Sequence, residues 1–206
     1  MNRNDSYFDG GLLQLIGYRI QGVLVTVLTL GICLPWAYTM VYSWEAKHTV
    51  INGERLHFEG TAIGLFGQWI KWFLLTIITL GIYGFWVGIK LRKWKYQHTH
   101  TESGKALVSD FDGGLLQLIG YRLLGGLVTI CTVGICLPWA FTMIYNWETK
   151  HTVISGHRLA FDGTAIGLFG NWIKWFLLSI ITLGIYSFWL QIKLKKWIVS
   201  HTHYGY

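Results

Sequence analysis

Two histidine pairs have the spacing that best fits metal chemistry in this chain. His98 and His100 flank one threonine, and His201 and His203 flank another. Side chains two residues apart on a β-strand point the same way, so each pair could offer two imidazoles to one ion. Because a zinc site usually needs three or four ligands, both pairs would have to meet. Ordinary histidines of surface strands are the simpler interpretation, and we predict neither a metal nor another cofactor.

Four cations lie beside or within long apolar stretches, namely Arg19, Lys71, Arg122 and Lys174. Ionisable groups in such segments are costly and often mark a functional path. These four are candidates for contacting anionic lipid headgroups or a solute. The competing interpretation is that they extend to a polar surface or pair with a carboxylate.

Catalytic signatures are missing from the sequence. It contains no phosphate-binding loop, HExxH zinc motif, nucleophile elbow or dinucleotide-binding glycine pattern. Tyrosine and tryptophan are abundant, but they form no recognisable acid–base group. We therefore predict that the protein is not an enzyme.

The segments that carry these residues are strongly apolar. Hydrophobic residues make up 52% of the chain, charged residues 13%, and the mean hydropathy is +0.40. Soluble domains usually contain about 25% charged residues. Four runs without Asp, Glu, Lys or Arg reach the length of transmembrane helices. They are Ile20–Trp44, Trp72–Ile89, Leu123–Trp147 and Trp175–Ile192. The sequence thus predicts an α-helical integral membrane protein.

The net charge of +7 is concentrated beside the apolar runs. Basic clusters occupy Lys90–Lys95 and Lys193–Trp197. Cations that directly abut apolar spans are typical of the cytoplasmic face of a membrane protein, where they meet anionic headgroups. We therefore expect membrane lipids as partners and no nucleic acid.

The chain is an internal repeat. Residues 8–100 align with 111–203 without gaps, and 70 of the 93 aligned positions are identical. A weaker offset of 50 divides each half again. The predicted organisation is two halves, 1–103 and 104–206, each made of two similar units. The four units are approximately 8–57, 58–107, 111–160 and 161–206.

Short polar segments join the apolar parts of the units. Asn52-Gly53 lies between alternating residues and is a strong β-hairpin signal, and Ser155-Gly156 is its weaker counterpart. Residues 4–8 and 201–206 are candidate single strands. The second and fourth units each contain a row of glycines that predicts close helix packing. These glycines are Gly60, Gly64, Gly67, Gly163, Gly167 and Gly170.

Several of these motifs together resemble one known family. They are HTVINGERLHFEGTAIGLFG (48–67), TLGIYGFW (79–86), KLRKW (90–94) and HTH (98–100). The combination is similar to the YjgN-like family of bacterial inner-membrane proteins, and the resemblance covers nearly the whole chain. It implies a multi-pass protein of the bacterial cytoplasmic membrane. It brings no established activity and no catalytic residues.

The path of each unit through the bilayer has two interpretations. If each apolar run were one straight span, equivalent basic ends would fall on opposite sides of the membrane, against the positive-inside rule. If each unit is instead a helical hairpin that turns at its TLGI or similar motif, all connectors share the cytoplasmic face. Gly at the end of one helix and Pro near the start of the next fit such a turn. We favour the hairpin, which includes a shallow re-entrant form.

Two functions follow from this architecture. The first is a structural or self-assembling protein that shapes the membrane and forms homo-oligomers through helix faces and terminal strands. The second is a channel or transporter for a small solute, with an anion as one candidate, at the interface between repeats. The few charges inside apolar segments favour the first.

Overall fold

A computed structural model describes residues 5–205. Positions 4 and 206, at the ends of the two candidate terminal strands, lie outside the described residues. The chain contains four consecutive units, and each has the order strand, helix, helix, strand. The first half contains β1 (Tyr7–Phe8), α1 (Leu12–Leu28), α2 (Leu34–Lys47), β2 (Thr49–Ile51), β3 (Glu54–Phe58), α3 (Ala62–Ile78), α4 (Gly84–Gln97) and β4 (Thr99–Thr101). The second half contains β5 (Asp110–Phe111), α5 (Leu115–Cys131), α6 (Leu137–Lys150), β6 (Thr152–Ile154), β7 (His157–Phe161), α7 (Ala165–Ile181), α8 (Ser187–Ser200) and β8 (Thr202–Tyr204).

The prediction of a multi-pass, α-helical membrane-spanning protein is wrong. Within residues 5–205, no helix combines the length and the apolar character needed to cross a membrane. The first helix of each unit has 17 residues and the second has 14. The short strands also form two four-stranded antiparallel sheets, so the fold combines α and β elements. The long apolar runs misled the prediction because each of them holds a turn and parts of two helices.

The turn has the same geometry in every unit. In the first, Leu30 (φ 50°) and Gly31 (φ 86°) adopt left-handed conformations after α1. The Gly31 N–H donates to the Thr26 carbonyl at 2.8 Å, which closes the helix end in a Schellman motif. Left-handed backbone is readily adopted by glycine, whereas the preceding leucine or valine takes it at a cost. The helices therefore reverse at the TLGI-type motifs.

The strands form two similar sheets, ordered β1-β2-β3-β4 and β5-β6-β7-β8. The chain reverses at Asn52-Gly53 between β2 and β3, which pair with Ile51 opposite Glu54. The sheets meet through a shared core in which Ile51 and Leu56 lie with Ile154 and Leu159. Within residues 5–205 the first and last strands do not pair with each other: β1 pairs with β2, and β8 pairs with β7.

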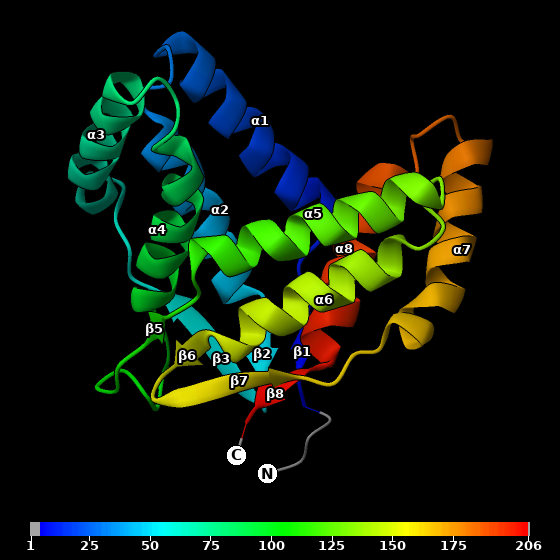
Figure 1. The fold of residues 1–206 in the computed structure, drawn as a ribbon. Coiled ribbons are helices and arrows are strands. Elements are labelled where there is room, and N and C mark those ends of the chain that lie inside the picture. The colour runs from blue at the N-terminus through cyan, green and yellow to red at the C-terminus, as the bar shows by residue number, and fades with distance from the viewer. Residues whose placement is uncertain (1–4, 206) are drawn as a thin grey trace.

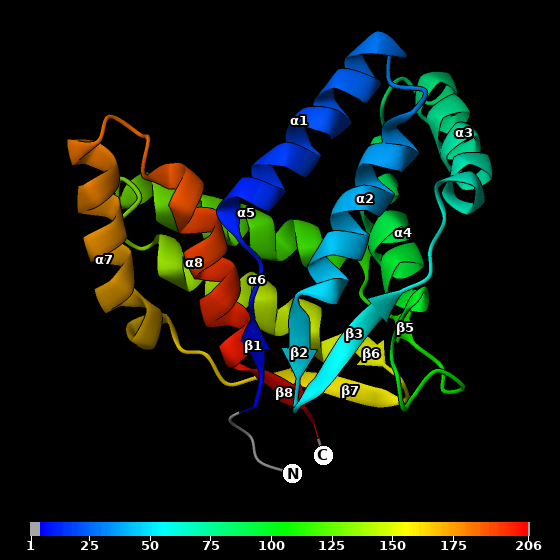
Figure 2. The same cartoon turned by 180° about the vertical axis from the view of Figure 1, so that it is seen from behind.

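The four units are arranged as a closed ring. The second helix of each unit packs on the first strand of the next: α2 on β3, α4 on β5 and α6 on β7. The ring closes because α8 packs on β1. All four helical turns lie in the upper half of Figure 1, two on each side, while both sheets lie at the bottom. Figure 2 shows the same arrangement from behind, with α8 beside β1.

Helices within a unit come closest at a glycine that the sequence reasoning missed. A Cβ atom at Gly22 in α1 would lie 2.9 Å from the Ala37 Cβ of α2, and Gly125 meets Ala140 in the same way. Contact this close requires glycine, so these two positions set the separation of the α1–α2 and α5–α6 pairs.

Candidate functional site

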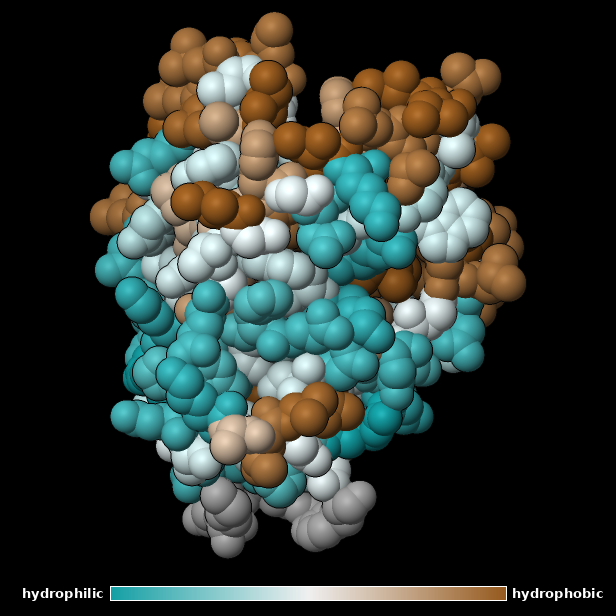
Figure 3. Space-filling view, turned by 90° about the vertical axis from the view of Figure 1, so that its left-hand side faces the viewer, coloured by the Kyte–Doolittle hydropathy of each residue, from teal (hydrophilic) through white to brown (hydrophobic). Residues whose placement is uncertain are grey.

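The exposed apolar side chains gather around the helical turns. At the apices of the four hairpins, Leu30, Leu80, Val133 and Leu183 are between 82% and 94% exposed. Neighbouring residues of both helices extend each apex, and in the second unit these are Ile77, Ile78, Phe85 and Trp86. Figure 3 shows hydrophobic residues over the upper end of one face and mainly hydrophilic residues below them. An apolar surface of this kind marks contact with lipid or with another protein.

The four cations singled out in the sequence lie partway along the first helices, and their side chains are exposed. Arg19 and Arg122 are equivalent positions in α1 and α5, and Lys71 and Lys174 are equivalent in α3 and α7. Arg19 donates to Gln191 on α8. Arg19 lines the groove along α1 and α2, whereas Arg122 lines the space between α4 and α5, so these two cations do not line one shared path.

The cations also mark where the apolar end of each first helix begins. From Arg19 to the end of α1 at Leu28 the helix rises about 14 Å, and from Lys71 to Ile78 it rises about 11 Å, at about 1.5 Å per residue. Half of a bilayer's hydrocarbon thickness is about 15 Å. The apolar end of each first helix beyond its cation is therefore close in length to half of a bilayer's hydrocarbon thickness.

One more apolar side chain is exposed in each unit, on the side of the cation that faces away from the helical turn. The first turns of α1, α3, α5 and α7 expose Leu13, Ile63, Leu116 and Ile166. A cation with apolar neighbours on both sides suits an interface, because its stem can lie along hydrocarbon while its charge reaches water or headgroups.

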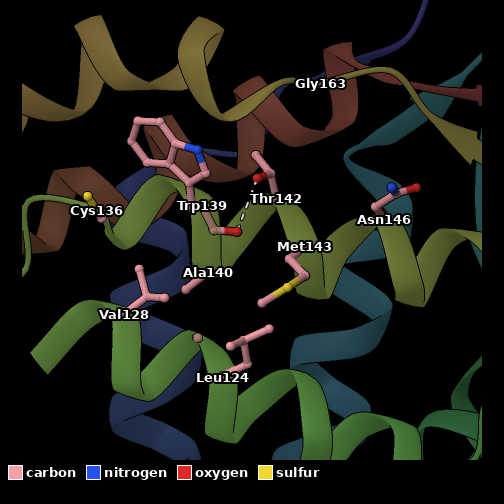
Figure 4. A pocket seen from close by; sticks show the side chains of 10 residues that line it. Leu124, Val128, Cys136, Trp139, Ala140, Thr142, Met143, Asn146 and Gly163 are labelled. Carbon is pink, nitrogen blue, oxygen red and sulfur yellow. Dashed lines mark hydrogen bonds between the residues drawn. The ribbon is translucent and has the colours of Figure 1, made fainter. Parts of the chain in front are cut away.

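Two hairpins also carry an open apolar groove. Along α5 and α6 it has a volume of about 560 Å³, and an equivalent groove of about 460 Å³ follows α1 and α2. In Figure 4, Leu124 and Val128 of α5 face Ala140 and Met143 of α6 across the groove. The nearly continuous apolar lining is suited to a hydrocarbon chain.

The predicted histidine pairs are divided between two roles. His98 and His201 end α4 and α8, where their Nδ1 atoms lie 2.8 and 2.7 Å from the carbonyl oxygens of Trp94 and Trp197. His100 lies in β4 with its Nε2 atom 3.5 Å from Glu59, and His203 lies in β8 near Asp162. One member of each pair is thus a helix cap. Within the described part of the chain, no group of three or more metal-binding side chains comes together.

The glycine row that was expected to pack helices occupies other surroundings. Gly60 precedes α3, and a Cβ there would lie 2.5 Å from the Trp94 ring. The Gly64 N–H donates to the Thr61 side chain that caps α3, and Gly67 has no neighbour within 4 Å of its Cβ position. Gly163, Gly167 and Gly170 repeat these three arrangements. Close packing of helices within the chain therefore depends on Gly22 and Gly125.

The structure also contains a charged cavity that sequence reasoning missed. It encloses about 320 Å³ between α2, α4, α6 and α8, above the core that joins the sheets. Glu45 accepts from Lys95 at 2.8 Å and lies 3.6 Å from Lys195. These charges meet because the ring turns the same face of every second helix toward its centre.

Glu148 forms the second group of charges in the cavity. It accepts from the Tyr96 hydroxyl at 2.9 Å, and the Arg92 Nε atom lies 3.4 Å away. The aromatic ring of Tyr42 lies 4.6 Å from the Lys95 ammonium. The carboxylates are thus held apart by cations and tyrosines from different units.

The ionisation of these groups reflects their burial and their partners. Burial alone would raise the pKa of Glu45, but the charges of Lys195 and Lys95 outweigh it and lower that pKa to about 2. For Lys95, burial opposes the charged form, whereas Glu45 raises the pKa of the ammonium. Burial raises the pKa of both Tyr42 and Tyr145 to about 12. At neutral pH the carboxylate of Glu45 and the ammonium of Lys95 are charged and both hydroxyls keep their protons.

One sequence signal could have located this cavity. With offsets of 50 and 103, Glu45 is equivalent to Lys95, Glu148 and Ile198, so one position of the repeat carries two carboxylates, one cation and one isoleucine. Opposite charges at one repeated position predict contact wherever the units face a common axis. This signal was missed because Lys95 and Lys195 belong to the basic clusters, which were interpreted as a patch that faces a membrane.

Comparison with known proteins places the chain by its sequence alone. A family model described as a bacterial protein of unknown function (DUF898) matches residues 53–107 and 156–205, just over half of the chain. Each match covers β3 to β4 or its counterpart, β7 to β8. No curated protein and no solved structure matches the chain. The two matches identify the chain as a member of this bacterial family of unknown function, the YjgN family.

Proposed function

We propose that the protein is a non-enzymatic structural protein that binds a lipid bilayer and inserts its four helical hairpins into one leaflet. The observation that supports this most strongly is the position of the apolar apices. They lie on the side of the ring away from the sheets, and each extends about one leaflet beyond an exposed cation. Apolar side chains would enter hydrocarbon while the cations reach anionic headgroups.

Lipid fits this surface better than a folded protein partner. The four apices are separate projections whose most prominent residues are leucine and valine, and two hairpins carry open apolar grooves. Fluid lipid chains can fill the spaces between these projections, whereas a protein partner would need recesses that match them. The exposed cations add attraction to an anionic surface of about 1 kcal/mol each.

This geometry also suggests what insertion would do. Four hairpins that enter only one leaflet would expand that leaflet relative to the other and bend the bilayer. The bacterial inner membrane, with its anionic cytoplasmic leaflet, is the surface we propose for this activity. Self-association through helix faces or terminal strands stays a prediction from the sequence.

Native cysteines provide a direct test. Cys33, Cys131 and Cys136 all lie beside hairpin turns, and the Cys131 side chain is exposed. Vesicles that contain anionic lipid should slow alkylation of Cys131 by a membrane-impermeant maleimide. A Leu107→Cys control lies in the loop between β4 and β5, away from the apices, and should keep its reactivity. Full reactivity of Cys131 on vesicles that have bound the protein would refute the proposed insertion.

A further inference from the structure

We propose that the central cavity binds a small oxyanion, such as a phosphate group, between Arg92 and Lys195. These residues are equivalent in the two halves, and both line the cavity at the level of Tyr42 and Tyr145. In the four successive units, the equivalent position is Tyr42, Arg92, Tyr145 and Lys195. Tyrosines and cations therefore alternate around the centre of the ring. This site is separate from the apices, and the proposal does not depend on membrane insertion.

The balance of charge is the first argument for an anion. The cavity is lined by three cations, Arg92, Lys95 and Lys195, and by two carboxylates, Glu45 and Glu148. The difference of three and two leaves one positive charge without a matching carboxylate among the lining residues. The side chains of these cations are only 21–33% exposed, so water hydrates their charges in part and a bound anion would stabilise them further.

A nearby cation increases this imbalance. Arg122 lines the space between α4 and α5, and burial together with the charge of Arg92 lowers the pKa of its guanidinium. The field of Arg122 therefore reaches the cavity. Glu148 offsets part of this effect on Arg122, but its charge is already shared by Arg92 and Tyr96.

Unused hydrogen-bond donors are the second argument. Arg92 approaches Glu148 through Nε, at 3.4 Å, so this contact does not use its two terminal nitrogens. Tyr42 and Tyr145 also line the cavity, and because burial raises the pKa of both to about 12, each hydroxyl keeps a proton to donate. A guanidinium fork and neutral hydroxyls are the donors that suit the oxygens of phosphate or carboxylate groups.

The size of the cavity limits the ligand. A volume of about 320 Å³ lies at the lower end of the range for small-molecule sites, about 300–1,000 Å³. It accommodates an oxyanion with a small substituent. The same group could arrive as free phosphate or as the headgroup of an anionic lipid.

Titration of the purified full-length protein in neutral detergent tests the site without a membrane. The probes are inorganic phosphate and a short-chain phosphatidic acid, with short-chain phosphatidylcholine for comparison. Arg92→Gln and Lys195→Gln should each weaken binding about tenfold, which is about 1.4 kcal/mol. Lys196→Gln is the matched control because Lys196 is the exposed neighbour of Lys195 on the same helix, and it should leave affinity unchanged.

Further variants separate binding from folding. Tyr42→Phe and Tyr145→Phe remove only a hydroxyl and should weaken binding, while circular dichroism reports whether the fold is kept. Binding of phosphate assigns a free oxyanion, and binding of phosphatidic acid alone assigns a lipid headgroup. Absence of binding to both probes, or an equal loss in Lys196→Gln and Lys195→Gln, would overturn the proposal.

Discussion

Serine substitutions at Leu80 and Leu183 offer the sharpest test of lipid insertion. Each side chain is 94% exposed at the apex of its hairpin, so nearly all of its apolar surface would move from water into hydrocarbon. Burying a leucine side chain contributes about 2 kcal/mol, which serine does not supply. The two residues lie on different hairpins and should act additively. The double variant should therefore lose about 4 kcal/mol, or about a thousandfold in partitioning.

Co-flotation with vesicles that contain anionic lipid measures this partitioning directly. Leu107→Ser is the control, because Leu107 is also exposed but lies in the loop between β4 and β5. The control should float like the unmodified protein at every lipid concentration. Equal flotation of the double variant and the unmodified protein, or an equal loss in the control, would refute the reasoning.

Three further predictions concern the core of the ring. The lowered pKa of Glu45, about 2, means that its carboxylate stabilises the fold above the unfolded pKa of about 4.3 and loses this effect as the pH falls. Urea unfolding should show that the free energy of unfolding falls by roughly 2–3 kcal/mol between about pH 5 and pH 2. This fall should be smaller in Glu45→Gln, whereas the exposed control Glu102→Gln should show the same fall as the unmodified protein. Gly22→Ala should leave the protein about 1–3 kcal/mol less stable than Gly17→Ala, because only the first Cβ meets α2. Ile198→Glu adds the missing carboxylate at the cavity and should abolish phosphate binding; unchanged affinity would contradict the charge argument.

Much of the local structure is readable from the sequence because it depends on short-range rules. The Asn52-Gly53 turn adopts positive φ at both residues, as its sequence demands. Gly31 and its equivalents end the first helices in the same way. The repeat itself fixes the number of units, because each offset aligns the same motifs.

The length of the apolar runs was the misleading signal. Ile20–Trp44 is long enough for a membrane span, but Gly31 divides it between α1 and α2. A hydropathy average cannot distinguish one long helix from two shorter ones that reverse. The strands were a weaker signal, since β1 to β8 are two to five residues long and gain stability only within their two four-stranded sheets.

Departures from the repeat carry information that its matching positions do not. Between the two halves, Lys95 is replaced by Ile198 and Tyr96 by Val199, whereas Glu45 and Glu148 are the same. Both replaced pairs line the central cavity. If the second half repeated the first exactly, two lysines, two arginines and two carboxylates would line the cavity. Its positive excess would then be larger than the observed one. The isoleucine removes one cation and leaves a single surplus charge, which is the charge that one bound oxyanion would neutralise. The replacement of Lys95 by Ile198 thus lowers the positive charge of the cavity, where an exact repeat would place more like charges close together.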